Sequence, residues 1–113
     1  MRGWPIKNTV ILEVSEDMDS VEEKISRYLC EKFQGEKEYK KGIYRKSINY
    51  REFAVKFDNG NSIEVTINQP QPDVYVVKLL CGVIYTGERY EPEGFIWNGK
   101  ESKVEKEIRE LFE

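Results

Sequence analysis

The chain has 113 residues, of which 39% are apolar, 12% aromatic and 35% charged, with a formal net charge of −3. This length fits one hydrophobic core, so we predict a single α+β domain over residues 1–113. The apolar and aromatic content excludes a disordered chain, and the net charge excludes a wholly basic nucleic-acid-binding protein. No apolar run approaches the ~20 residues that a membrane helix needs, so we expect no membrane partner.

Histidine is absent from the sequence, which removes the commonest general base and metal ligand. Ser–His and Cys–His catalytic pairs therefore cannot form within this chain. The two cysteines, Cys30 and Cys81, lie in apolar stretches and neither belongs to a CxxC pair. No glycine-rich phosphate-binding motif occurs. We predict a protein that is not an enzyme, with no metal and no cofactor. The N-terminus lacks the apolar region of a secretory signal, so we expect two reduced thiols in a cytoplasmic protein.

The first part of the chain reads as a strand followed by a helix. Residues 6–14 alternate in polarity, which is typical of a strand. Ser20 and Glu23 match a capping box, which predicts a helix over residues 21–33 with Ser20 as its N-cap. Gly35 is the expected end of the helix, and residues 34–41 resemble a polar connection.

The middle of the chain predicts strands that follow one another closely. Residues 49–57 and 62–67 both alternate in polarity, and Asp58–Asn61 contains the Asn-Gly pair typical of a hairpin turn. Pro70 and Pro72 flank the next turn. Residues 74–86 are apolar on both faces, which favours a central position in the sheet.

The last part predicts a short strand and a second helix. The strand covers Phe95–Trp97, and Asn98-Gly99 turns the chain towards the helix. Four apolar residues at helical spacing form the helix's buried stripe: Val104, Ile108, Leu111 and Phe112.

The elements together predict an α+β fold of order β-α-β-β-β-(β)-α. Its simplest packing is two layers, with a mostly antiparallel sheet of four to five strands and two helices on one face. A crossover through the first helix, which would make a parallel strand pair, is the open alternative.

Positive charge is concentrated in residues 37–51, where six basic residues accompany one acidic residue, Glu38. Cations hold phosphates and aromatic rings stack on unpaired bases, so this mixture is a candidate site for single-stranded nucleic acid or RNA. The ordinary alternative is a solvated loop that balances an acidic body. The candidate residues are Lys37, Tyr39, Lys40, Lys41, Tyr44, Arg45, Lys46 and Arg51.

The loop at residues 87–94 is acidic and bounded by glycines. Aromatic residues are enriched at the centres of protein contacts, so Tyr90, Phe95 and Trp97 are the candidate protein-contact residues. A plain hairpin loop is the alternative. A second acidic group, Glu16, Asp17 and Asp19, suits a hard cation but also complements the start of a helix without any ligand.

The far face of the sheet offers another candidate. If Phe53, Val55 and Leu79 face the helices, then Tyr75, Val76 and Leu80 cannot all face them too. An uncovered apolar face marks an interface, so we expect a homodimer through the sheet unless another segment folds over it. The sequence thus predicts a regulatory, adaptor or inhibitor module that binds itself and a protein partner. The alternative is nucleic-acid binding through residues 37–51.

Overall fold

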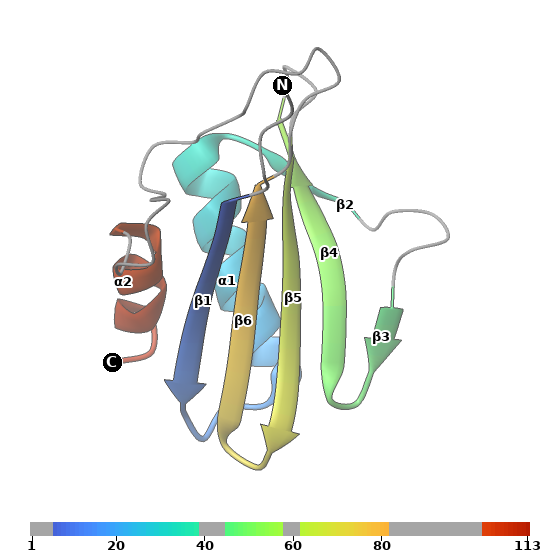
Figure 1. Ribbon diagram of the computed structural model, residues 1–113, viewed down its shortest axis with the longest axis vertical. Helices are drawn as coiled ribbons and strands as arrows, with labels where there is room; N and C mark the ends of the chain where they lie inside the picture. The colour runs from blue at the N-terminus through green and yellow to red at the C-terminus, as the bar shows by residue number, and fades with distance from the viewer. Residues whose placement is uncertain (1–5, 39–44, 58–61, 82–102) are drawn as a thin grey trace.

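The computed structural model describes residues 6–38, 45–57, 62–81 and 103–113, with the backbone only for residues 6, 7, 45–47 and 81. Figure 1 shows one sheet, a long helix behind it and a short helix at its side. The elements in chain order are β1 (Ile6–Glu13), α1 (Met18–Phe33), β2 (Glu36–Glu38), β3 (Arg45–Ser47), β4 (Tyr50–Lys56), β5 (Ser62–Gln71), β6 (Val74–Cys81) and α2 (Lys103–Glu110).

The strands form a sheet of order β1-β6-β5-β4-β2, and β3 also pairs with β4. Every pairing among the described strands is antiparallel. β1 and β2 form the two edges of this order, and α1 lies between them in the sequence. The chain therefore passes from one edge of the sheet to the other through α1. The predicted α+β class is therefore confirmed, and the parallel alternative is not found in the part of the chain that is described.

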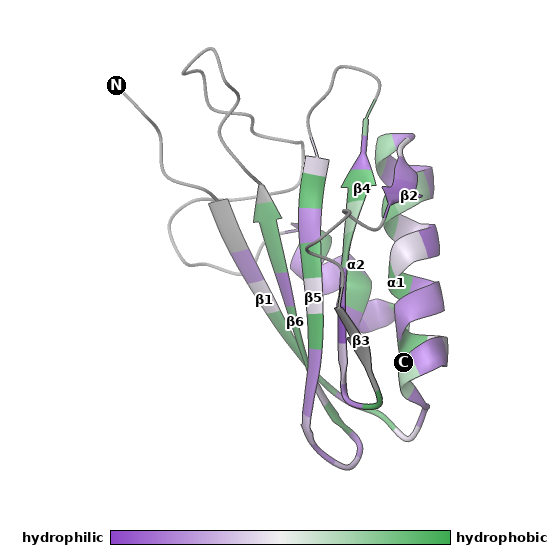
Figure 2. Ribbon diagram, turned by 90° about the vertical axis from the view of Figure 1, so that its right-hand side faces the viewer, coloured by the Kyte–Doolittle hydropathy of each residue, from purple (hydrophilic) through white to green (hydrophobic). Residues whose placement is uncertain are grey.

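The two helices share one buried cluster with a single face of the sheet, which we call the inner face. α1 lies across this face (Figure 2), and α2 packs beside β1 (Figure 1). The largest fully buried side chains come from both helices and four strands: Val10, Val21, Ile25, Leu29, Val55, Ile63, Val65, Ile67, Tyr75, Leu79 and Ile108.

The start of α1 differs from the prediction. The helix begins at Met18, and its N-cap is Asp17, whose carboxylate accepts a hydrogen bond of 2.8 Å from the Ser20 N–H. Asp is as good a cap as Ser, and the earlier start buries Met18. Ser20 instead donates its hydroxyl to Glu16.

The end of α1 also differs. Gln34, rather than Gly35, adopts the left-handed conformation, with φ at 53°. Gly35 is needed for a different reason, because a Cβ there would lie 2.7 Å from Val55 and 2.9 Å from the Lys56 carbonyl oxygen. This close approach brings the chain onto the edge of β4 as β2, in a stretch that the sequence predicted to be a connection.

The β4–β5 hairpin is confirmed, with Val55 opposite Ile63, although its predicted turn, 58–61, lies outside the described residues. The next turn is shifted from the prediction. β5 continues through an irregularity between Asn68 and Gln71 that accommodates Pro70, and Asp73 turns the chain with φ at 64°.

β6 lies between β1 and β5, as its apolar character predicted. Tyr75 faces inward and is fully buried, and its hydroxyl donates to the Glu16 carbonyl oxygen. Val76 and Leu80 therefore lie on the opposite face. Residues 82–86 and the predicted Phe95–Trp97 strand fall outside the described residues.

α2 confirms the predicted last helix, with Val104 and Ile108 buried and Phe112 packed against the cluster. Neither described helix is long and apolar enough to span a membrane.

Candidate functional site

The outer face of the sheet, turned away from α1, is the candidate site. Its side chains alternate with those of the core along β1, β6, β5 and β4, and no described helix lies on it (Figure 1). The strand register arranges these side chains in rows across the sheet. The outer face consists of Thr9, Ile11, Glu13, Tyr50, Glu52, Ala54, Lys56, Ser62, Glu64, Thr66, Asn68, Val74, Val76, Lys78 and Leu80. Among these, Ala54 is buried, with 2% of its surface exposed.

One row is mainly apolar and lies near the β5–β6 turn. It joins Ile11, Val76, Asn68 and Tyr50 from one edge strand to β4. Ile11 is 60% exposed, and Ile48, in the turn that leads into β4, is 89% exposed. These are the two exposed large hydrophobic residues among those described, and they flank this row at opposite edges of the sheet.

The next row is polar and carries opposite charges at a distance. It joins Thr9, Lys78, Thr66 and Glu52. Lys78 on β6 and Glu52 on β4 are separated by Thr66 on β5, so their Cα atoms are two strand spacings, or about 10 Å, apart. Among the described side chains of this row, the cation lies on one side of β5 and the anion on the other, and the backbone of Arg45 on β3 continues the row beyond Glu52.

The edges of the sheet are less suited to contacts than its face. At β1, the Thr9 N–H donates to Glu105 of α2 at 2.9 Å, so the helix covers part of this edge. At the other edge, β2 has the sequence Glu-Lys-Glu. Pairing two copies through β2 in antiparallel register would set Glu36 against Glu38 and is unfavourable.

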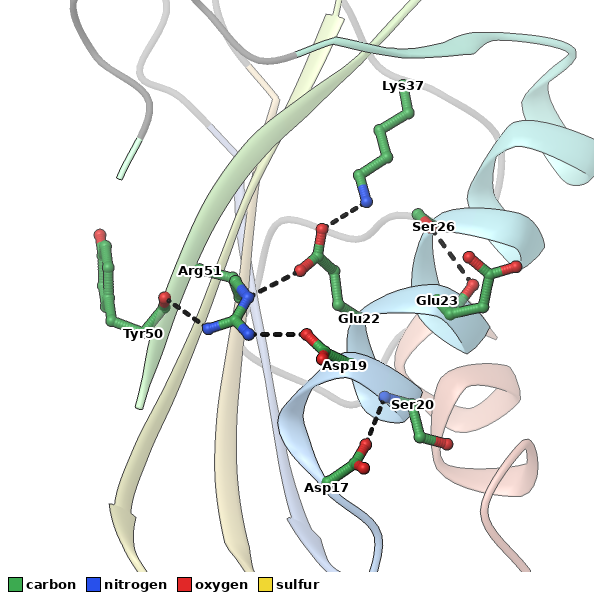
Figure 3. Close-up of polar contacts among 9 residues, drawn as sticks. All are labelled: Asp17, Asp19, Ser20, Glu22, Glu23, Ser26, Lys37, Tyr50 and Arg51. Carbon is green, nitrogen blue, oxygen red and sulfur yellow. Dashed lines mark hydrogen bonds and ion pairs between the residues drawn. The ribbon is translucent and has the colours of Figure 1, made fainter. Parts of the chain in front are cut away.

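Arg51 and Lys37, from the basic segment, lie inside the molecule's own ion pairs. Arg51 points into the space between β4 and α1 and is 5% exposed (Figure 3). Its Nε lies 2.9 Å from Glu22 Oε1, and its Nη2 lies 2.7 Å from Asp19 Oδ1. Lys37 donates to Glu22 from the other side.

Lys37 also lies 4.8 Å from the centre of the Phe53 ring, which gives it a cation–π contact. Lys37 and Arg51 thus fasten β2 and β4 to α1 and neutralise the buried Glu22. The structure gives backbone positions for Arg45 and Lys46 on β3. Tyr39, Lys40, Lys41 and Tyr44 lie outside the described residues, so the grouping of the eight candidate residues stays a prediction.

β2 and β3, at the two ends of residues 36–47, both pair with the same edge of β4. Glu38 of β2 lies opposite Ala54, and Arg45 of β3 lies opposite Glu52. The two short strands thus follow the same edge, and only Phe53 separates their partners. Residues 39–44 connect two points that are close together, which no sequence pattern had indicated.

The predicted contact residues Tyr90, Phe95 and Trp97 lie outside the described residues. The acidic group before α1 has intramolecular partners. Asp17 caps the helix and Asp19 pairs with Arg51. Lys24 and Ser20 bond Glu16 and hold the pKa of its carboxyl below the usual range. Within the described ranges, no three Cys, Asp or Glu side chains form a metal site.

A groove of about 530 Å³ runs between α1 and α2. Tyr28 donates to Glu107, which also lies 3.2 Å from Lys32 Nζ. The Tyr28 hydroxyl lowers the pKa of the Glu107 carboxyl, whereas burial raises the pKa of Tyr28. These shifts favour a neutral Tyr28 hydroxyl and a charged Glu107 carboxylate, which are the two forms that make the hydrogen bond between the helices. The remaining lining residues are Glu31, Glu110 and Leu111.

Cys30, on α1, is a free thiol that is partly buried. Burial raises its pKa, which disfavours the reactive thiolate. This environment suits a packing residue better than a nucleophile.

Comparison of the chain with protein families, with curated proteins and with solved structures gave no match. The function is therefore argued from the side chains and their arrangement.

Proposed function

We propose that the chain is a non-enzymatic interaction module that contacts another protein through the outer face of its sheet. The observation that carries the proposal is the exposure of Ile11, 60%, in an apolar row on a sheet face without a described helix. Exposed apolar residues grouped on one face are typical of protein contacts.

Two further features support a binding role over catalysis. The chain has no histidine, and Glu107, Tyr28 and Glu16 are engaged in bonds between elements of the fold. A regulatory, adaptor or inhibitor role in the cytoplasm fits a small protein of this kind. Cys30, as a free thiol, is compatible with that compartment.

The proposal is tested by comparing what immobilised wild-type and variant proteins capture from source lysate after nuclease treatment. Ile11→Glu places a charge in the apolar row and should remove specific protein partners. Lys106→Gln changes the net charge in the same direction on an exposed position of α2, so it should leave capture unchanged. Equal capture by wild type and Ile11→Glu would contradict the proposal.

Nucleic-acid binding through residues 37–51 is the second candidate, and the same experiment addresses it. Material lost on nuclease treatment would favour this candidate, and its binding should weaken steeply as salt rises. Because Arg51 and Lys37 hold the fold together, the variants for this candidate are Lys40→Glu and Lys41→Glu. Retention of nuclease-sensitive material by these variants would argue against the segment.

A further inference from the structure

The outer face has a charge pattern that is complementary to itself under one particular symmetry. Consider two copies packed face to face around a two-fold axis that runs along β5. The rotation keeps each position along the strands and reverses the order of strands across the sheet. β6 of one copy then lies over β4 of the other, and the mean strand directions stay aligned, as in common sheet packing.

In this arrangement the polar rows match. Lys78 is level with Thr66, and Thr66 is level with Glu52. Lys78 of each copy therefore faces Glu52 of the other, and symmetry makes two such pairs. An axis along β6 would set Lys78 against Lys78, and an axis along β4 would set Glu52 against Glu52. An axis running across the strands through this row would produce both like-charge contacts, so of these four axes the one along β5 pairs opposite charges.

The apolar row gives an independent reason for the same axis. Val76 is level with Tyr50 across Asn68, so these two side chains face each other between the copies. β1 lies over β3, and Ile11 is level with Ser47, the residue before Ile48. Ile11 of one copy thereby lies near the β3–β4 turn of the other, which carries Ile48, 89% exposed.

One contact opposes this arrangement and is useful for testing it. Glu64 lies on β5 between Leu80 and Ala54, so the axis brings the two Glu64 side chains towards each other. This like-charge contact weakens the dimer, and its removal should strengthen association. Because this contact opposes association, we expect a reversible dimer.

We propose that the occupant of the outer face is a second copy of this chain, packed about a two-fold axis along β5 with Lys78 of each copy facing Glu52 of the other. This inference rests on the proposed function, because it uses the same face. It adds the identity of the partner and the pairing of the charges.

The test is sedimentation equilibrium of the full chain over a range of concentrations up to about 1 mM, where even a dissociation constant of ~1 mM gives measurable dimer. Lys78→Glu and Glu52→Lys should each weaken dimerisation about tenfold or more, because each creates two like-charge contacts. The double variant restores both pairs and should associate within about threefold of wild type. Glu64→Gln should tighten the dimer.

Several results would overturn the inference. They are a monomer at every concentration, a dimer that neither single reversal weakens, or a double variant no stronger than the singles. Thermal unfolding of each variant establishes that it is folded. Lys106→Glu and Glu110→Lys, at exposed positions of α2, are the controls for the net-charge changes of −2 and +2. A monomeric chain whose partner capture still depends on Ile11 would reject the two-fold dimer and leave the proposed function standing.

Discussion

The Nε atom of Arg51 on β4 lies 2.9 Å from Oε1 of Glu22 on α1, and both side chains are less than a tenth exposed. Removing one member of such a pair leaves a charge in a poorly solvated place. We expect Arg51→Ala to lower the free energy of unfolding by about 3 kcal/mol, within the range seen for broken buried pairs. Urea denaturation monitored by circular dichroism measures this loss.

An exposed ion pair on the same helix provides the control. Nη2 of Arg27 lies 2.6 Å from Oε1 of Glu23, and the two side chains are 65% and 59% exposed. Arg27→Ala should cost about 0.5 kcal/mol or less, because solvent screens exposed pairs. Equal costs for the two substitutions would show that Arg51 does not stabilise the α1–β4 contact as described.

Gly35 marks the place where the chain passes close to β4. Gly35→Ala should destabilise the protein by about 2 kcal/mol, because its Cβ would collide with Val55 and with the backbone at Lys56. Gln34→Gly, next to it, relieves a left-handed backbone and should be neutral or stabilising. The midpoint of thermal unfolding should fall for Gly35→Ala and stay constant or rise for Gln34→Gly. An unchanged midpoint for Gly35→Ala would contradict the close approach.

The N-cap of α1 provides a third prediction. Asp17→Ala removes the acceptor of the Ser20 N–H and should cost about 1 kcal/mol. Ser20→Ala, which leaves the cap intact, should cost less. If Ser20→Ala were the more damaging of the two, the helix would begin where the capping box in the sequence suggested.

Acid should weaken the contact between the helices. The Tyr28 hydroxyl bond lowers the pKa of Glu107 below its ordinary 4.5, so this carboxylate stabilises the fold above that pH. The stabilisation is lost as pH falls through the lower, folded pKa. The stability difference between wild type and Glu107→Gln should therefore shrink towards low pH. Tyr28→Phe should reduce the same pH dependence, and a difference independent of pH would contradict this assignment.

Alternation and spacing were sufficient to predict β1, the β4–β5 hairpin, the central β6 and both helices. These elements bury regular apolar stripes, so local pattern and tertiary packing agree. The short strands β2 and β3 were not predicted, because their Glu, Lys and Arg residues resemble a solvated connection. β2 is held at β4 by the close approach at Gly35 and by the ion pair of Lys37 with Glu22, which are long-range contacts.

Arg51 illustrates why the site was harder to predict than the fold. In the sequence it belongs to a basic run, but alternation with Phe53 and Val55 places it on the buried side of β4. Its partner, Glu22, is 29 positions earlier in the chain, and no local pattern links them. The face with Lys78 and Glu52 could be assigned only after the strand register was known.

The most direct test of self-association through the outer face is a methyl-resolved NMR spectrum recorded at increasing protein concentration. Ile11 reports on the outer face, and Ile25 of α1, fully buried, is the internal control. If two copies pack through the outer face, the methyl signals of Ile11, Val76 and Leu80 should shift or broaden as the concentration rises. The methyl signals of Ile25 should stay constant. Unchanged outer-face signals up to about 1 mM, or shifts confined to α1 and α2, would contradict this packing.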